Sequence, residues 1–313
     1  YKRQTLADVT PHARLTATLG WFNMSWSLGK GAGYLVGGFL LARFGFPALF
    51  AAAGAAVLGV ALVLRGIPTS GTRAGQDPGP AVRGAAPDAA RDALPRSAPA
   101  APRSGDAASA PPHDAALPEV PPSPAVRPGL LGAAWVGNFV CFGSAAALNF
   151  HYPQWLETHG LPETVFGTYL GLIFASETLA FFLLRRFDGW RYRVAPVLVA
   201  PLPSVVALIL LPSLEATWLV FLTAPAVGLG LGLAYFASVF YSLEDVAHRG
   251  RNAGIHEASL ALGAVFLPLA GGLAATLTGS LRAPYLTAAA LGALAIVVQT
   301  GMLMASGRRP RTD

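Results

Sequence analysis

The stretch LTATLGWFNMSWSLGKGAGYLVGGFLLA, residues 15–42, decides the fold class of this chain. Lys30 is its one charged residue, and the stretch exceeds the about 20 apolar residues that a helix needs to cross about 30 Å of hydrocarbon. The whole chain has the same character, because 53% of its 313 residues are hydrophobic and only 12% are charged, whereas about 25% are charged in a soluble domain. The composition therefore predicts an all-α, polytopic transmembrane helical bundle.

Eight stretches of this kind lie between arginine-bearing or turn-rich segments, and an even number of spans places both chain ends on one side of the membrane. The predicted spans are residues 15–42, 47–64, 130–150, 164–184, 194–211, 217–242, 254–278 and 284–305. If they alternate in direction, every Lys and Arg falls on one side except Arg43, Arg282 and Lys30. The positive-inside rule then makes both termini cytoplasmic, in a bacterial cytoplasmic membrane. Basic residues scattered in this way argue against nucleic-acid binding.

A repeat appears when the chain is shifted by 234 residues against itself. The shift superimposes the first span on the seventh, with Gly29 on Gly263, Gly37 and Gly38 on Gly271 and Gly272, and Gly45 on Gly279. Six spans separate the two copies, so the sequence predicts an architecture of two six-helix halves.

These glycines resemble a signature of the major facilitator superfamily of secondary transporters, G-x-x-x-G-P-x-x-G-G in its helix five. Gly29, Gly33, Gly37 and Gly38 stand in that register, with Tyr34 in place of the proline, and Gly263, Pro268, Gly271 and Gly272 repeat the pattern. The resemblance implies an MFS-like fold of which this chain covers helices five to twelve, with four helices of the same protein expected before Tyr1. It also implies alternating access, moving a small solute across the lipid bilayer.

Three regions follow from this comparison. Residues 1–65 would be the last two helices of a truncated N-terminal half, and residues 129–313 the C-terminal six-helix half. Residues 66–128 are rich in Ala, Pro, Arg and Asp, which predicts a disordered cytoplasmic linker. The glycines and Pro268 are predicted to serve helix packing and gating, since small residues let helix backbones approach closely in lipid.

Two ionisable residues lie deep inside predicted spans, where each needs a partner or a water-filled cavity. Lys30 is near the middle of the first span and Glu177 is near the middle of the fourth. We expect them to lie close enough to pair, and three interpretations stay open: a structural lock, a role in coupling or gating, or no contact.

Other polar residues recur at helical spacing and are predicted to line the substrate pathway or to take part in coupling. Asn138 and Asn149 have the alternative of interhelical hydrogen bonds, and Glu257, beside His256, that of a carboxylate in the first turn of a helix. With Lys30 and Glu177, the candidates are Asn23, Ser27, Tyr34, Asn138, Asn149, Tyr235 and Glu257.

The sequence shows no pattern for catalysis, metal binding or a cofactor: Cys141 is the single cysteine, and no nucleotide-binding or nucleophile motif is present. The sequence does not distinguish protons from another coupling ion as the species that drives transport. The solute is equally open among sugars, organic acids, amphiphilic drugs and peptides. Two alternatives to transport remain. One is a non-transporting sensor, and the other is a membrane-embedded transferase using His151, Glu157, His159 and Glu163.

Overall fold

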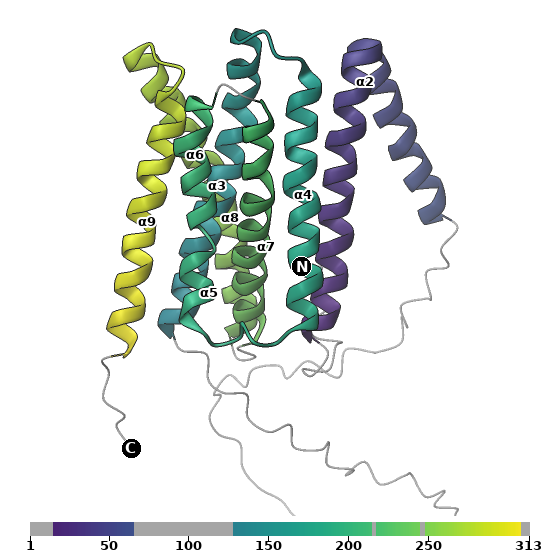
Figure 1. Cartoon of the computed structure of the whole chain (residues 1–313). Helices are drawn as coiled ribbons and strands as arrows, with labels where there is room; N and C mark the ends of the chain where they lie inside the picture. Colours follow the sequence, from purple (N-terminus) through teal and green to yellow (C-terminus); the bar gives the residue numbers. More distant parts are fainter. Residues whose placement is uncertain (1–14, 66–127, 215–216, 245–247, 308–313) are drawn as a thin grey trace, which may run out of the picture. The chain divides into compact units, whose positions relative to one another are not determined.

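The computed structural model describes residues 15–65, 128–214, 217–244 and 248–307, which are almost wholly helical and contain no β-strand (Figure 1). The all-α prediction is confirmed. The predicted linker lies outside the described residues, apart from Pro128. In chain order the elements are α2 (Leu15–Arg65), α3 (Pro128–Thr158), α4 (Glu163–Arg186), α5 (Val194–Val199), α6 (Leu202–Leu210), the 3-10 helix η2 (Leu211–Ser213), α7 (Thr217–Glu244), α8 (Arg249–Thr278) and α9 (Ala283–Gly307).

Seven helical segments of the described chain are long and apolar enough to cross a membrane. One of them, Val194–Ser213, combines α5, α6 and η2, which are interrupted near Pro201 and Pro203. Proline removes a helical hydrogen bond and clashes with the preceding turn, so the interruption has a local cause. The prediction of a membrane-spanning bundle is confirmed.

The first of these segments, in α2, contains two of the eight predicted spans. The 51 residues of α2 would measure about 77 Å in a straight helix, more than twice the hydrocarbon thickness. Gly45 breaks the helix with φ 74° and ψ −178°, and Pro47 follows. The chain folds back at this break. The closeness of the two segments is seen at Gly37, where a Cβ would lie 3.6 Å from Cδ1 of Leu49. α2 is therefore two helices joined at Gly45.

Several helices extend beyond the predicted spans. α3 continues through Pro153 to Thr158, and α8 begins at Arg249 rather than at Gly254. Hydrophobicity detects the segment that crosses hydrocarbon, whereas polar turns can continue the helix into the interfacial region. The apolar stretches thus located the helices but not their ends.

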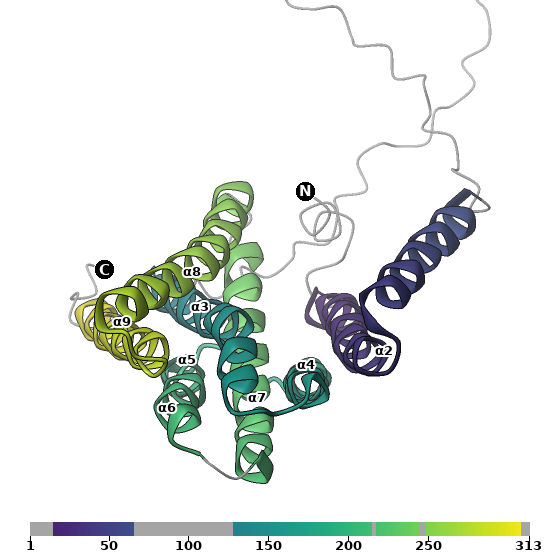
Figure 2. The same cartoon turned by 90° about the horizontal axis from the view of Figure 1, so that it is seen from above.

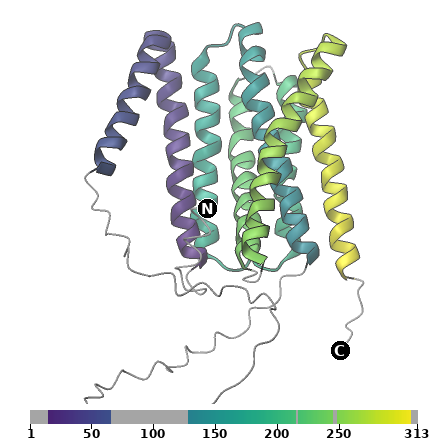
Figure 3. The ribbon, with the colours of Figure 1, turned by 180° about the vertical axis from the view of Figure 1, so that it is seen from behind.

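α3 lies at the centre of the six-helix part of the chain. It packs against α7, α8 and α9, while α4 packs chiefly against α7 (Figure 2). Figure 3 shows α8 and α9, yellow-green and yellow, running beside α3. The buried side chains form two clusters, one of which includes Leu15 and Leu19 from the start of α2. The start of α2 therefore shares a core with the helices after residue 127.

The chain divides into two compact units. Residues 1–54 and 123–313 form the first unit, and residues 55–122 form the second. Of the second unit, the structure describes residues 55–65, the last turns of α2. The candidate site lies wholly within the first unit.

The repeat is visible in the helix ends. Gly45, at the break in α2, and Gly279, which follows α8, are 234 residues apart. Both glycines have positive φ, 74° and 65°. A left-handed residue ends a helix with little strain only if it lacks a Cβ, so both copies stop at equivalent glycines for the same reason.

Candidate functional site

The predicted polar face of the first helix is the face that α2 buries. Asn23 and Ser27 are fully buried, and Lys30 and Tyr34 follow on the same face with partial burial. Leu28, on the other side of the helix, is 60% exposed. The inward direction of this face was predictable from spacing alone.

Ser27 connects α2 to the buried carboxylate of α4. Its hydroxyl donates a hydrogen bond to Oε2 of Glu177 and lies 3.0 Å from the carbonyl oxygen of Phe174. Glu177 is fully buried, and its Oε1 has no hydrogen-bond partner among the described residues; the same is true of both amide atoms of Asn23. Buried polar atoms are normally hydrogen-bonded, so these atoms have the capacity to bind a further polar group.

Lys30 lies beside this carboxylate but contacts aromatic rings. Its Nζ is 3.9 Å from the ring centroid of Trp26 and 3.9 Å from that of Phe174. Glu177 is near enough to act on Lys30 electrostatically, yet the ion pairs found among the described residues do not join the two. The expected proximity is therefore present, while the ammonium group is held by the negative faces of two rings.

Two further rings extend this arrangement. Tyr34 stacks on Phe174 with centroids 5.4 Å apart and planes at 8°, and Tyr235 stacks on Trp26 with centroids 5.8 Å apart. Tyr235 is fully buried. The ammonium of Lys30 thus stands within a run of four aromatic rings contributed by α2, α4 and α7.

The two candidate asparagines of α3 have different surroundings. Asn149 accepts a hydrogen bond of 3.2 Å from the hydroxyl of Tyr34, which joins α3 to the polar face of α2. Asn138 is fully buried and its Nδ2 donates to the Ser259 hydroxyl at 3.1 Å and to the His256 carbonyl at 3.4 Å. Asn149 therefore belongs with the candidate site, whereas Asn138 makes an interhelical bond to α8.

The interpretation of Glu257 as a first-turn carboxylate is wrong. α8 begins at Arg249, so Glu257 lies in its third turn, and the first turn has no acidic residue. The side chain of Glu257 is exposed, while its neighbour His256 is buried with Nδ1 2.8 Å from the Ser238 hydroxyl. The error came from starting the helix where the apolar stretch starts.

The glycines of α2 do not pack as their stripe suggests. A Cβ on Gly29 or Gly33 would have no heavy atom within 4 Å. The close approach to α4 occurs at Gly38, where a Cβ would lie 3.1 Å from the Cα of Gly167. The register of Gly167 opposite Gly38 depends on how the two helices cross.

The corresponding glycines of α8 do pack closely. A Cβ on Gly263 would meet the carbonyl oxygen of Phe139 in α3, and one on Gly271 would lie 3.0 Å from the Cα of Pro284 in α9. Gly272 has more room, since its nearest neighbour is a ring atom of His151 at 3.7 Å. These contacts agree with the role of small residues in helix packing.

The two histidines considered for a transferase site form hydrogen bonds with backbone carbonyl groups. The Nε2 of His151 is 3.1 Å from the carbonyl oxygen of Pro268, which is buried in α8, and Nδ1 of His159 is 2.7 Å from the carbonyl oxygen of Trp155. In the described part of the chain, no group of three or more His, Cys, Asp or Glu is placed to hold a metal ion.

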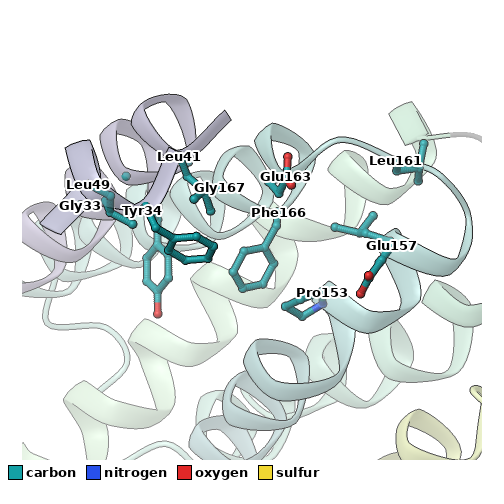
Figure 4. A pocket seen from close by; sticks show the side chains of 14 residues that line it. Gly33, Tyr34, Leu41, Leu49, Pro153, Glu157, Leu161, Glu163, Phe166 and Gly167 are labelled. Atoms are coloured by element: carbon teal, nitrogen blue, oxygen red, sulfur yellow. The ribbon is translucent and has the colours of Figure 1, made fainter. Parts of the chain in front are cut away.

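A cavity of about 740 Å³ lies next to Tyr34, between the bend of α2 and the ends of α3 and α4 (Figure 4). This size is within the range of about 300–1,000 Å³ of pockets for small molecules. Its walls are mainly apolar and aromatic, with two carboxylates. The lining residues are Gly33, Tyr34, Gly37, Gly38, Leu41, Phe46, Leu49, Pro153, Leu156, Glu157, Leu161, Glu163, Phe166 and Gly167.

At the opposite end of α4, the loop to α5 ties three helices together. The Arg191 guanidinium donates to Thr16 of α2 at 2.5 Å and pairs with Asp188 at 2.7 Å. Tyr192 has a φ of 56°, and its hydroxyl donates to Glu244 of α7. Burial and then the Glu244 carboxylate raise the pKa of Tyr192, because both disfavour the phenolate.

Sequence reasoning missed the two rings that hold Lys30. Trp26 precedes Lys30 by four residues, and Phe174 precedes Glu177 by three, so both share a helix face with a charged residue. That spacing was available as a signal. The meeting of the two faces was not, because it depends on the crossing of α2 and α4.

Comparison with known proteins gives one match. A family model described as Major Facilitator Superfamily matches residues 4–254, which is most of the chain. The chain matches no curated protein and no solved structure at a significant level.

Proposed function

The chain belongs to the Major Facilitator Superfamily, and from this premise we propose that it is a secondary active transporter that moves a small solute by alternating access. The family match and the seven membrane-length helices of the described residues identify the chain as a multi-pass membrane protein of a transporter family. The arginine asymmetry of the sequence supports both termini lying on the cytoplasmic side, and we place the protein in a bacterial cytoplasmic membrane.

The observation that carries this proposal is the burial of Glu177 inside a membrane span. A carboxylate there costs several kcal/mol by most estimates unless it is neutral or well partnered. Its Oε2 accepts a hydrogen bond from Ser27, while Oε1 has no partner among the described side chains. A group so placed is stable when it carries a proton and poorly stabilised when it does not, as a coupling site requires.

We assign Lys30 as the nearby positive charge that lets Glu177 release its proton. The ammonium is not bound to the carboxylate, so a change in its position alters the stability of the carboxylate charge. These groups lie on α2 and α4, which the predicted repeat assigns to different halves of the transporter. A rocking motion between halves would change the distance between the two charges.

The test is transport by the full-length protein in proteoliposomes carrying an internal pH dye. Solutes from the open classes are added one by one under an imposed pH gradient, and solute uptake and proton movement are recorded together. We expect one class to move with protons, and we expect Glu177→Gln to keep solute exchange while losing proton movement. Ser27→Ala should weaken coupling without abolishing exchange, since it removes one of the contacts that position the carboxylate.

Two results count against the proposal, and they differ. Proton movement that persists in Glu177→Gln removes Glu177 from coupling but leaves transport intact. Absence of gradient-driven movement of every solute removes the transporter assignment itself.

A further inference from the structure

The charge of the cavity beside Tyr34 restricts what it can hold. Glu157 and Glu163 both line it, and the lining contains no Lys or Arg among the described residues. The remaining wall is apolar, with the rings of Tyr34, Phe46 and Phe166 among its members. Both glutamates are exposed, and their charges attract cations and repel anions, so the lining fits an apolar molecule that carries a positive charge.

A second feature of the site recognises the same chemistry. An ammonium held between two aromatic faces, as Lys30 is between Trp26 and Phe174, is the arrangement that proteins use to bind quaternary ammonium ligands. The buried carboxylate of Glu177 stands nearby without an ion pair to Lys30. The position now taken by Nζ therefore offers the nitrogen of an organic cation two aromatic faces and a nearby carboxylate.

Tyr34 connects these two features. It lines the cavity, and its ring stacks on Phe174, whose own ring contacts the Lys30 ammonium. The Tyr34 hydroxyl is held by Asn149. Two stacked aromatic side chains, Tyr34 and Phe174, thus connect the cavity to the ammonium position.

We propose that the substrate is an organic cation with an apolar body, and that Lys30 occupies its cation site whenever the site is empty. The inference rests on the proposed function, because it names the substrate class of the same transporter. An arriving cation would displace the flexible lysine side chain from between the rings and take its place near Glu177. The position between the two rings would then hold a cationic group in both states, either the Lys30 ammonium or the ligand.

The first test is binding of tetraphenylphosphonium to the purified full chain, compared with tetraphenylborate. The two ions have nearly the same shape and opposite charge, so the difference between them isolates the sign of the charge. We expect tetraphenylphosphonium to bind at least about tenfold more tightly, equivalent to about 1.4 kcal/mol. Equal binding, or tighter binding of the borate, would overturn the inference, since Lys30 would then be a partner for anions.

Variants test the exchange between Lys30 and the ligand. Lys30→Met removes the internal competitor while keeping a long side chain, and we expect it to bind tetraphenylphosphonium about tenfold more tightly. Trp26→Leu and Phe174→Leu should each weaken binding about 5- to 30-fold, because each removes one cation–π contact. Trp218→Leu is the matched control, since Trp218 is 64% exposed on α7, and it should leave binding unchanged.

Thermal unfolding of each variant without ligand shows whether it is folded, and the comparison between Lys30→Met and wild type stands even if a ring variant is unstable. Unchanged or weaker binding in folded Lys30→Met would overturn the role of Lys30. Binding of the phosphonium without gradient-driven uptake would instead count against transport. Gradient-driven uptake of another solute, with no phosphonium binding, would leave transport intact and refute the substrate class.

Discussion

The close contact of glycines between α2 and α4 predicts different stabilities for two glycine-to-alanine variants. The gain in helix propensity is the same in both, so it cancels when they are compared. Gly29 and Gly167 both lie inside helices, so changing either to alanine gains the same about 0.5–1 kcal/mol of helix propensity. Their surroundings differ. A Cβ on Gly167 would lie 2.7 Å from the carbonyl oxygen of Tyr34 and 3.0 Å from the Cα of Gly38, whereas one on Gly29 would meet nothing within 4 Å.

The size of the difference follows from these distances. Ordinary contact begins at 3.4 Å, so the new methyl group at Gly167 is 0.7 Å too close to a backbone atom that cannot rotate away. Overpacking of this kind costs about 1–3 kcal/mol. We therefore expect Gly167→Ala to be less stable than Gly29→Ala by about 1–3 kcal/mol, with Gly29→Ala as stable as wild type or slightly more so.

Equilibrium unfolding of the purified chain in mixed detergent micelles, followed by circular dichroism, measures this difference. Gly38→Ala should resemble Gly167→Ala, because a Cβ there would lie 3.1 Å from the opposite Cα. If Gly29→Ala is destabilised as much as Gly167→Ala, the reasoning is refuted, and the stripe of Gly29, Gly33 and Gly37 is the packed face, as the sequence suggested.

Two further predictions concern the bend of α2 and the loop after α4. Gly45→Ala should lower the free energy of unfolding by about 1–3 kcal/mol, because its φ of 74° with ψ of −178° is a conformation open almost only to glycine. The control is Gly54→Ala, where a Cβ would meet nothing within 4 Å, and it should show no loss in the same unfolding assay. The raised pKa of Tyr192 means that the unfolded chain loses this proton first, so the contribution of Tyr192 is complete below about pH 10 and falls as the pH rises further. Tyr192→Phe should accordingly lose less thermal stability than wild type between about pH 9 and about pH 11, the range around the ordinary tyrosine pKa. An identical loss in both proteins would contradict the assigned pKa direction.

The fold class was predictable because one physical requirement dominates it. Lipid demands long apolar helices, and these leave a strong signal in a single sequence. The bend at Gly45 was predictable in position but not in form, since Gly45 and Pro47 stand between two apolar stretches. The start of α8 was not, because the turns from Arg249 to Gly254 are helical without being apolar.

The candidate site was predictable only in part. Spacing placed Asn23, Ser27, Lys30 and Tyr34 on one face, and depth suggested that Lys30 and Glu177 lie near each other. The contacts of the ammonium depend on how α2 crosses α4, and small shifts in that crossing decide whether Nζ meets a carboxylate or a ring. A single sequence contains no direct record of the crossing.

The repeat separates the part of α2 that serves packing from the part that serves chemistry. The glycine at which the helix stops is shared with α8, as Gly45 and Gly279, and this feature determines where each helix ends. The charged and aromatic residues are not shared: at the same offset of 234 residues, the counterparts of Trp26, Ser27 and Lys30 are Leu260, Ala261 and Ala264. A charge in hydrocarbon is costly wherever it occurs, so a helix that needs only to pack has no reason to keep one. Lys30 is present in the copy that faces Glu177 and two aromatic rings, where its cost is offset, and this selective placement favours a role for the ammonium beyond holding helices together.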